Sequence, residues 1–185
     1  NQLIGDKIAI TSPVAQTTRN RLRAILTTDE AQLILVDTPG IHKPHHLLGE
    51  RLVRSARSAI GEVDQVLLLL EGCEAPGRGD AFIVQLLRQQ PLPVQVLLNK
   101  WDLVPMEKKD AAAAAYRELL GETDWPVHRC SALSGDGCPE LVKAISALMP
   151  EGPQLYPSDM VSDQPERLLM GELIREQVLL NTREE

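Results

Sequence analysis

Two short polar motifs, each at the end of an apolar run, are the residues of this sequence whose types and spacing could do chemistry. Asp37-Thr38-Pro39-Gly40 follows the apolar run at 33–36, and Asn99-Lys100-Trp101-Asp102 follows the run at 94–98. Polar side chains at the carboxyl ends of buried parallel strands form the usual ligand crevice of an open α/β sheet. The two motifs therefore predict one ligand site at the end of a sheet.

The first motif has the composition of a magnesium and phosphate sensor. The Asp37 carboxylate can hold Mg²⁺ through water, because Mg²⁺ prefers oxygen ligands and keeps several waters. Gly40 has no Cβ, so its backbone N–H can approach the terminal phosphate of a nucleotide. The alternative is that Pro39-Gly40 is only a turn that leaves the strand.

The second motif has the groups that distinguish guanine from adenine. The Asp102 carboxylate can accept hydrogen bonds from guanine N1–H and from the exocyclic amine, a pattern that adenine does not offer. We expect Asn99 to brace the loop and Lys100 to lay its alkyl stem over the base. The alternative is a strand end followed by the start of a capped helix.

Two further polar pairs lie in the order that such a nucleotide site requires. Ser131-Ala132 follows a short predicted strand, so the Ala132 backbone N–H could meet guanine O6. Thr17-Thr18 lies in a polar loop before the first motif, and the Thr18 hydroxyl could complete the Mg²⁺ shell. Loops of this kind can be ordered by a γ-phosphate and released after hydrolysis. Taken alone, Ser131-Ala132 is a weak signal because such dipeptides are common, and the Thr pair is equally consistent with an ordinary solvated loop.

The composition is that of a globular domain with an aliphatic core. The chain of 185 residues is 43% hydrophobic and only 3% aromatic, so Leu, Ile, Val and Ala must fill the interior. A net charge of −7 disfavours a nucleic-acid surface across this stretch. The three cysteines show no CxxC spacing and no apolar run is long enough to cross a bilayer, so we expect reduced thiols and a cytoplasmic protein.

Strand and helix patterns alternate along the chain. The sequence predicts extended segments at 7–11, 21–26, 32–36, 66–70, 94–98 and 127–130. It predicts helices at 48–60, from Asp80 as the cap to Pro91, at 106–120, at 141–148 and from Pro165 onward. Repeated strand–helix–strand units predict an α/β fold with a mostly parallel sheet and helices on both faces.

A change of composition near residue 151 predicts a boundary. The stretch 151–165 is rich in Pro, Ser and Asp, as linkers are. The amphipathic helix that follows has nothing in this sequence to pack on, so we expect it to open a second domain. Its apolar set is Leu168, Leu169, Leu173, Ile174 and Val178.

The order of these motifs on an α/β pattern resembles that of translation-factor-type GTPases, and most closely the Era family. Near the N-terminus, 7–12 and 15–19 resemble the Era switch region, as do residues 36–42. Toward the C-terminus, the residues that resemble the linker and opening helix of the Era KH domain are 156–157, 163, 166–167, 172–176 and 181–185.

The resemblance implies a P-loop NTPase-like three-layer fold that binds GTP and GDP with Mg²⁺, hydrolyses GTP and assists small-ribosomal-subunit maturation. Residues 1–150 would be an Era-type G domain, 151–165 a linker, and 166–185 the first helix of a KH-type RNA-binding domain. In that family the KH domain binds 16S rRNA. Peripheral association with the inner membrane face and a monomeric state are implied as well.

The sequence departs from the family pattern in its phosphate-binding parts. No GxxxxGK[ST] motif occurs, and residues 1–5 resemble the end of the helix that follows it, so the first and central strand of the sheet is missing. The KH GxxG clamp is missing too. Ile41 stands where Ras-type GTPases carry a water-orienting Gln, so the catalytic residue is unknown and we expect slow hydrolysis. We therefore expect a fragment of a longer GTPase that binds GTP weakly by itself.

A non-catalytic module is the alternative from another class. A pseudo-GTPase scaffold could have lost its phosphate loop, and an RNA-binding protein could carry a vestigial G domain. Asp37, Gly40, Asn99 and Asp102 argue against the scaffold, because guanine recognition has little use without phosphate contacts. The acidic charge and the absent GxxG argue against the RNA-binding reading for this stretch.

Overall fold

The computed structural model describes residues 1–12, 21–38 and 61–182. Thr17, Thr18, Gly40, Ile41 and the helix predicted at 48–60 lie outside these ranges. The predicted roles of these residues stay predictions.

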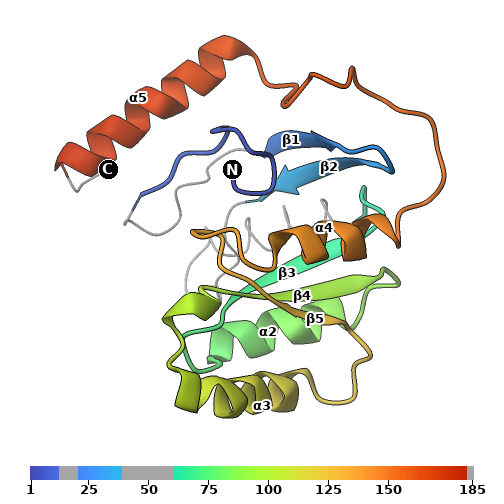
Figure 1. Ribbon diagram of the computed structural model, residues 1–185, viewed down its shortest axis with the longest axis vertical. Helices are drawn as coiled ribbons and strands as arrows, with labels where there is room; N and C mark the ends of the chain where they lie inside the picture. Colours follow the sequence, from blue (N-terminus) through green and yellow to red (C-terminus); the bar gives the residue numbers. More distant parts are fainter. Residues whose placement is uncertain (13–20, 39–60, 183–185) are drawn as a thin grey trace.

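Two separate sheets carry the strands of the described residues (Figure 1). The parallel sheet has the order β3-β4-β5, with β3 at Val66–Glu71, β4 at Val94–Asn99 and β5 at Val127–Arg129. The second sheet is an antiparallel hairpin of β1 (Leu22–Thr27) and β2 (Gln32–Asp37). In the parallel sheet Leu98 lies between Leu70 and Arg129, so the three strands end side by side.

Helices cover both faces of the parallel sheet. Below it in Figure 1 lie α2 (Arg78–Leu87) and α3 (Lys109–Leu120), the latter preceded by the short 3₁₀ turns η1 (Trp101–Leu103) and η2 (Met106–Lys108). Their buried side chains, including Val84 and Tyr116, pack against β3 and β4. On the other face, Leu141 of α4 (Cys138–Ser146) packs with Leu97. The α/β prediction is therefore confirmed.

β4 shows why its sequence reads as an apolar run with a single polar residue. All of Val94–Leu98 is buried, because helices cover both sides of the strand. The one polar residue of the run, Gln95, is 1% exposed and donates from Nε2 to Ala144 O at 3.0 Å. The amide is thereby tied to α4.

The start of α2 differs slightly from the prediction. The N-cap is Gly77, and Asp80 is the third residue after this cap. The Asp80 carboxylate still accepts the Gly77 N–H at 2.7 Å, so it satisfies a donor at the helix start as expected.

The extended segment predicted at 7–11 forms no strand in the described part of the chain. The Asn1 side-chain oxygen instead accepts the N–H groups of Ile8 at 2.9 Å and Ala9 at 2.8 Å. A side chain thus takes the donors that a neighbouring strand would use, which sequence periodicity does not reveal.

The segment at 151–165 is fixed to the hairpin by several hydrogen bonds, although it was predicted as a linker. The Gln32 side-chain oxygen accepts the N–H groups of Leu155 and Tyr156, both at 2.9 Å. Ile25 N–H donates to Val161 O at 2.9 Å, beside a bridge between Ala24 and Ser162. The domain boundaries themselves stay a prediction.

The last helix, α5 (Glu166–Thr182), was predicted correctly but does have a packing partner within the chain. Its buried residues are Glu176 and Leu179, and Glu176 bonds to Lys7 and Thr11. The predicted apolar set stays largely exposed, with Ile174 at 65% and Val178 at 48%. No described helix is both long and apolar enough to cross a membrane.

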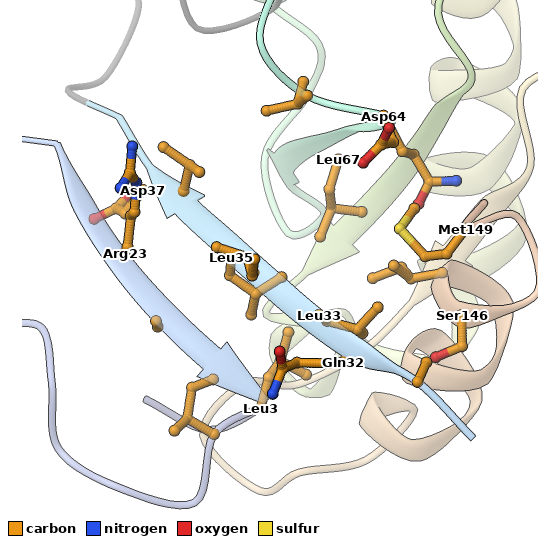
Figure 2. Close-up of a pocket in the computed structure, with 18 of the residues that line it drawn as sticks. Leu3, Arg23, Gln32, Leu33, Leu35, Asp37, Asp64, Leu67, Ser146 and Met149 are labelled. Carbon is orange, nitrogen blue, oxygen red and sulfur yellow. The ribbon is translucent and has the colours of Figure 1, made fainter. Parts of the chain in front are cut away.

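A groove of about 1400 Å³ lies between the two sheets, where β2 and β3 do not pair. Figure 2 shows Leu33 and Leu35 on the β2 side and Leu67 on the β3 side. Leu3 and Met149 also line the groove. Two apolar strands therefore face each other across an open space among the described residues.

Candidate nucleotide-binding site

The loops after β4 and β5 are joined by the side chain of Asn99. Asn99 is the last residue of β4, and its Oδ1 accepts the backbone N–H of Ala132 at 2.9 Å. Its backbone oxygen accepts Gly72 N–H at 2.8 Å, which ties in the loop after β3. Asn99 thus joins these loops in the structure, and its role in a nucleotide site stays a prediction.

The same contact changes what Ala132 offers to a ligand. Its N–H was expected to meet guanine O6, but in this structure it donates to Asn99. Ala132 itself is exposed, so the donor lies at the surface of the site. A base oxygen would have to share this N–H with Asn99 Oδ1 or displace it.

Lys100 makes the chain turn sharply at the end of β4. Its φ of 58° is left-handed, and among the described residues no other non-glycine residue has a positive φ. For an ordinary side chain this conformation costs roughly 1–2 kcal/mol, and such strain gathers at functional sites. The ammonium pairs with Glu71, whose hydrogen bond raises the pKa of Lys100.

Asp102 lies in η1, one residue beyond Trp101, and is exposed. Its carboxylate makes no hydrogen bond or salt bridge to any residue within the described ranges. Both oxygens are therefore available to accept from a base edge. Trp101 N–H donates to Cys130 O at 3.0 Å, which holds this turn against the end of β5.

Ser131 shapes the second loop from the inside. It is 2% exposed, its N–H donates to Asp136 O at 3.0 Å, and its carbonyl accepts Gly135 N–H at 2.8 Å. The loop depends on two left-handed glycines, Gly135 at φ 88° and Gly137 at φ 76°. A Cβ at Gly137 would collide with Arg129 O. The turn-rich stretch 134–137 was the signal that sequence reasoning passed over.

The thiol next to this loop is a structural group. Cys130 is 2% exposed, and burial raises its pKa to about 11. Its Sγ lies 3.7 Å from Asn99 Oδ1 as a weak donor. Cys138 is buried and Cys73 half-buried, and all three thiols are free in this structure.

Asp37 is the described member of the predicted magnesium and phosphate half of the site. It ends β2, is exposed, and lines the same groove as Asn99 and Ala132. The described residues hold no cluster of three or more His, Cys, Asp or Glu that could bind a metal. One exposed carboxylate fits an ion that keeps most of its waters, such as Mg²⁺.

Comparison with known proteins gives a consistent result. A family described as 50S ribosome-binding GTPase matches residues 1–100. GTPase Era of Synechocystis sp. is 53% identical over the whole chain, and GTPase Era of Nostoc sp. is 55% identical. The chain spans 59% and 57% of the length of these two relatives.

Two solved Era structures have the same fold along the whole chain. Era in complex with MgGDPNP and nucleotides 1506–1542 of 16S ribosomal RNA has a TM-score of 0.90 and 36% identity. A variant of Aquifex aeolicus Era bound to GDP·AlF₄⁻ has a TM-score of 0.89, also with 36% identity. Both matches cover 100% of this chain and 63% of the other. The chain therefore belongs to the 50S ribosome-binding GTPase family and, within it, to the Era GTPases.

Proposed function

We propose that this chain carries the base-reading part of a GTPase that binds GTP and GDP with Mg²⁺, hydrolyses GTP and acts in maturation of the small ribosomal subunit. The observation that carries the proposal is the bond between Asn99 Oδ1 and Ala132 N–H, which joins the two loops that end β4 and β5. The Era complexes with MgGDPNP and 16S rRNA, and with GDP·AlF₄⁻, support the choice of nucleotide and RNA.

In the part of the site that binds the base, each described residue has one proposed role. Asp102 accepts the guanine N1–H and exocyclic amine, since its carboxylate is exposed and unpaired within the described ranges. Lys100 flanks the base with its alkyl stem. The Ala132 N–H, which donates to Asn99 Oδ1 in this structure, is shared with guanine O6 or released to it when the base binds. Ser131 holds that loop in shape from its buried position.

The phosphate half uses Asp37 together with Thr18 and Gly40 of the sequence. Asp37 and Thr18 supply oxygen atoms for Mg²⁺, which when bound neutralises charge on the phosphates. Gly40 N–H approaches the γ-phosphate. Hydrolysis is an in-line attack of water, in which positioning and charge stabilisation supply most of the catalysis.

The groove between β2 and β3 leaves room for a further strand, which would carry a phosphate loop. Both strands turn apolar side chains, such as Leu35 and Leu67, toward it (Figure 2). Each has a single hydrogen-bonded neighbour among the described strands, so one edge of each is open. A strand in this position would end beside Asp37 and Asn99, which line the same groove.

The C-terminal end supports an RNA-binding extension. α5 keeps Ile174 and Val178 exposed, as expected of a helix that packs against a second domain. We assign α5 to a KH-type domain that reaches 16S rRNA, with the whole protein a monomer that associates peripherally with a membrane.

A nucleotide titration tests the proposal. The chain alone, and the chain with the coding sequence that precedes Asn1 in its gene, are titrated with GDP, GTP and ADP in the presence of Mg²⁺. We expect the longer chain to bind guanine nucleotides and to hydrolyse GTP slowly. The chain alone should bind on the order of 100-fold more weakly, because it lacks several charge-assisted phosphate contacts.

Each outcome of the titration tests a different part of the proposal. Tight GTP binding by the chain alone would contradict the need for a further strand and phosphate loop. Failure of the longer chain to prefer guanine over adenine nucleotides would contradict the function itself. Binding without hydrolysis would indicate a scaffold rather than an enzyme.

A further inference from the structure

The ring of Trp101 is in contact with two other parts of the chain. It lies so close to the turn after β3 that a Cβ at Gly72 would lie 2.9 Å from Trp101 Cε3. The Arg129 guanidinium carbon lies over the ring, 5.1 Å from its centroid, within the range of a cation–π contact. The ring also packs against the core formed by β3, β4, α2 and α3. The position of the ring is therefore fixed by three contacts: the turn at Gly72, the Arg129 guanidinium and the core.

The backbone of Trp101 is fixed as well. Its N–H donates to Cys130 O at 3.0 Å, so it is tied to the residue that follows β5. It directly follows Lys100, whose left-handed φ of 58° sets the direction of the turn. A turn in this conformation persists only when its surroundings hold it. Trp101 supplies both a backbone bond and a packed ring for that purpose.

Asp102 has no such support of its own. Its carboxylate makes no hydrogen bond or salt bridge to other described residues, and the side chain is exposed. The direction of this carboxylate therefore depends on the backbone of η1, which begins at Trp101. Loosening the Trp101 ring would let the turn relax and the carboxylate point elsewhere.

We propose that Trp101, packed beside Gly72 and under the Arg129 guanidinium, is a positioning residue that aims the Asp102 carboxylate and thereby sets selectivity for the exocyclic amine of guanine. The inference rests on the proposed function, since it concerns how that site reads its base. Trp101 itself touches no reacting group. Its effect is on the geometry of the residue that follows it.

The experiment compares GDP with inosine diphosphate, whose base lacks the exocyclic amine. It uses the nucleotide-binding form of the protein, the chain with its preceding coding sequence. One hydrogen bond to a carboxylate predicts a preference of the wild type for GDP on the order of 10- to 100-fold. We expect Trp101→Leu to reduce this ratio below about threefold, because a misdirected carboxylate no longer reads the amine. Trp101→Phe, which keeps a ring, should restore part of the ratio.

Trp125 provides the matched control, because it is half-buried and packs against the same core as Trp101. Trp125→Leu should lower stability but leave the GDP to inosine diphosphate ratio within about twofold of the wild type. An equal fall of the ratio in Trp125→Leu would overturn the inference, since any loss of core packing would then suffice. An unchanged ratio in Trp101→Leu would overturn it too.

Arg129→Met keeps the test decisive if Trp101→Leu does not fold. This change removes the cation above the ring, and we expect the ratio to fall by about threefold, in line with a cation–π contact of about 0.5–1 kcal/mol. A folded Arg129→Met with the wild-type ratio would then overturn the inference.

The wild type itself gives two further outcomes. Equal binding of GDP and inosine diphosphate would overturn the inference while leaving nucleotide binding intact. Binding of neither nucleotide would contradict the proposed function instead.

Discussion

The Glu176 carboxylate on α5 accepts the backbone N–H of Thr11 at 2.7 Å, across 165 residues of sequence. The same carboxylate accepts from Thr11 Oγ1 at 3.2 Å and pairs with the Lys7 ammonium. Glu176 is 1% exposed, so these contacts replace the water that the charge would otherwise bind. The C-terminal helix is thereby joined to the N-terminal segment.

Removing the Glu176 charge should weaken the attachment of α5 to the N-terminal segment. Glu176→Gln keeps an acceptor for Thr11 N–H but loses the pair with Lys7, and we expect about 1–2 kcal/mol less free energy of unfolding at neutral pH. Denaturant unfolding measures the difference. Glu172→Gln is the control, because the pair of Glu172 with Arg175 within one helix should contribute about 0.5 kcal/mol or less.

The Glu176 contribution should also depend on pH. Hydrogen bonds from Lys7 and then from Thr11 N–H hold the pKa of Glu176 below its ordinary value of 4.5. A carboxylate with a lowered pKa stabilises the fold fully above its unfolded pKa, and the contribution is lost as pH falls through the folded pKa. The gap between wild type and Glu176→Gln should therefore be constant above about pH 6 and shrink below about pH 4.5. A gap that widens with acid would contradict the assigned contacts.

Gly72 should tolerate no larger residue, because its neighbours leave no room. A Cβ there would lie 2.9 Å from Trp101 Cε3, 3.0 Å from Asn99 O and 3.1 Å from Leu98 Cβ. We expect Gly72→Ala to destabilise the protein by about 1–3 kcal/mol. Gly79→Ala in α2 meets nothing within 4 Å and should stabilise by about 0.5–1 kcal/mol, the ordinary helix effect. Thermal unfolding of both variants checks the contrast.

Asn99→Ala should loosen the loop after β5, which contains Ala132. The change removes the Oδ1 acceptor, so Ala132 N–H loses its 2.9 Å partner, and we expect about 1 kcal/mol less stability. Amide hydrogen exchange at Ala132 should accelerate, since exchange reports local opening. Asn99→Asp keeps the acceptor and should protect this amide as the wild type does. Equal protection of Ala132 in the alanine variant would refute the brace.

Tyr116 should anchor the turn after β3 through its hydroxyl. The phenol is 1% exposed and donates to Glu71 O at 2.9 Å, with Glu74 O at 3.2 Å. Tyr116→Phe should lower the free energy of unfolding by about 1 kcal/mol. Tyr156→Phe, which loses one 3.2 Å bond to Asp163 nearer the surface, should lose less. A larger loss in Tyr156→Phe would contradict this ranking.

Ionisation of Tyr116 should set an upper pH limit on this contribution. Burial, followed by the nearby acidic groups, raises its pKa to about 12. An unfolded tyrosine ionises near 10, so stability should fall as pH rises between about 10 and 12. Tyr116→Phe should remove that part of the alkaline loss, which unfolding curves at rising pH would show.

The sequence predicted the parallel sheet well because its signals are local. β4 reads as an apolar run with Gln95 as its one polar residue because both its faces are covered, and the polar motif after it marks where the strand ends. The prediction placed the cap of α2 at Asp80, whereas the N-cap is Gly77, since a carboxylate that bonds back to the first amide resembles a cap in the sequence.

The long-range contacts could not be predicted, because nothing local encodes them. Gln32 bonds across 123 residues to Leu155, so the segment read as a linker is docked on the hairpin. The buried residues of α5 are Glu176 and Leu179, and neither belongs to the apolar set predicted for packing. In the site, the left-handed Lys100 and the contact of Trp101 with Arg129 depend on the meeting of β3, β4 and β5.

The most direct test of the base-reading site is a change in the nucleotide that Asp102 selects. In xanthosine diphosphate the exocyclic amine is replaced by a carbonyl, which a carboxamide can bond and a carboxylate cannot. In the nucleotide-binding form of the protein, Asp102→Asn should weaken GDP binding on the order of 100-fold and should bind xanthosine diphosphate more tightly than GDP. If Asp102→Asn binds GDP within about threefold of the wild type, Asp102 does not read the base and the proposed site is wrong.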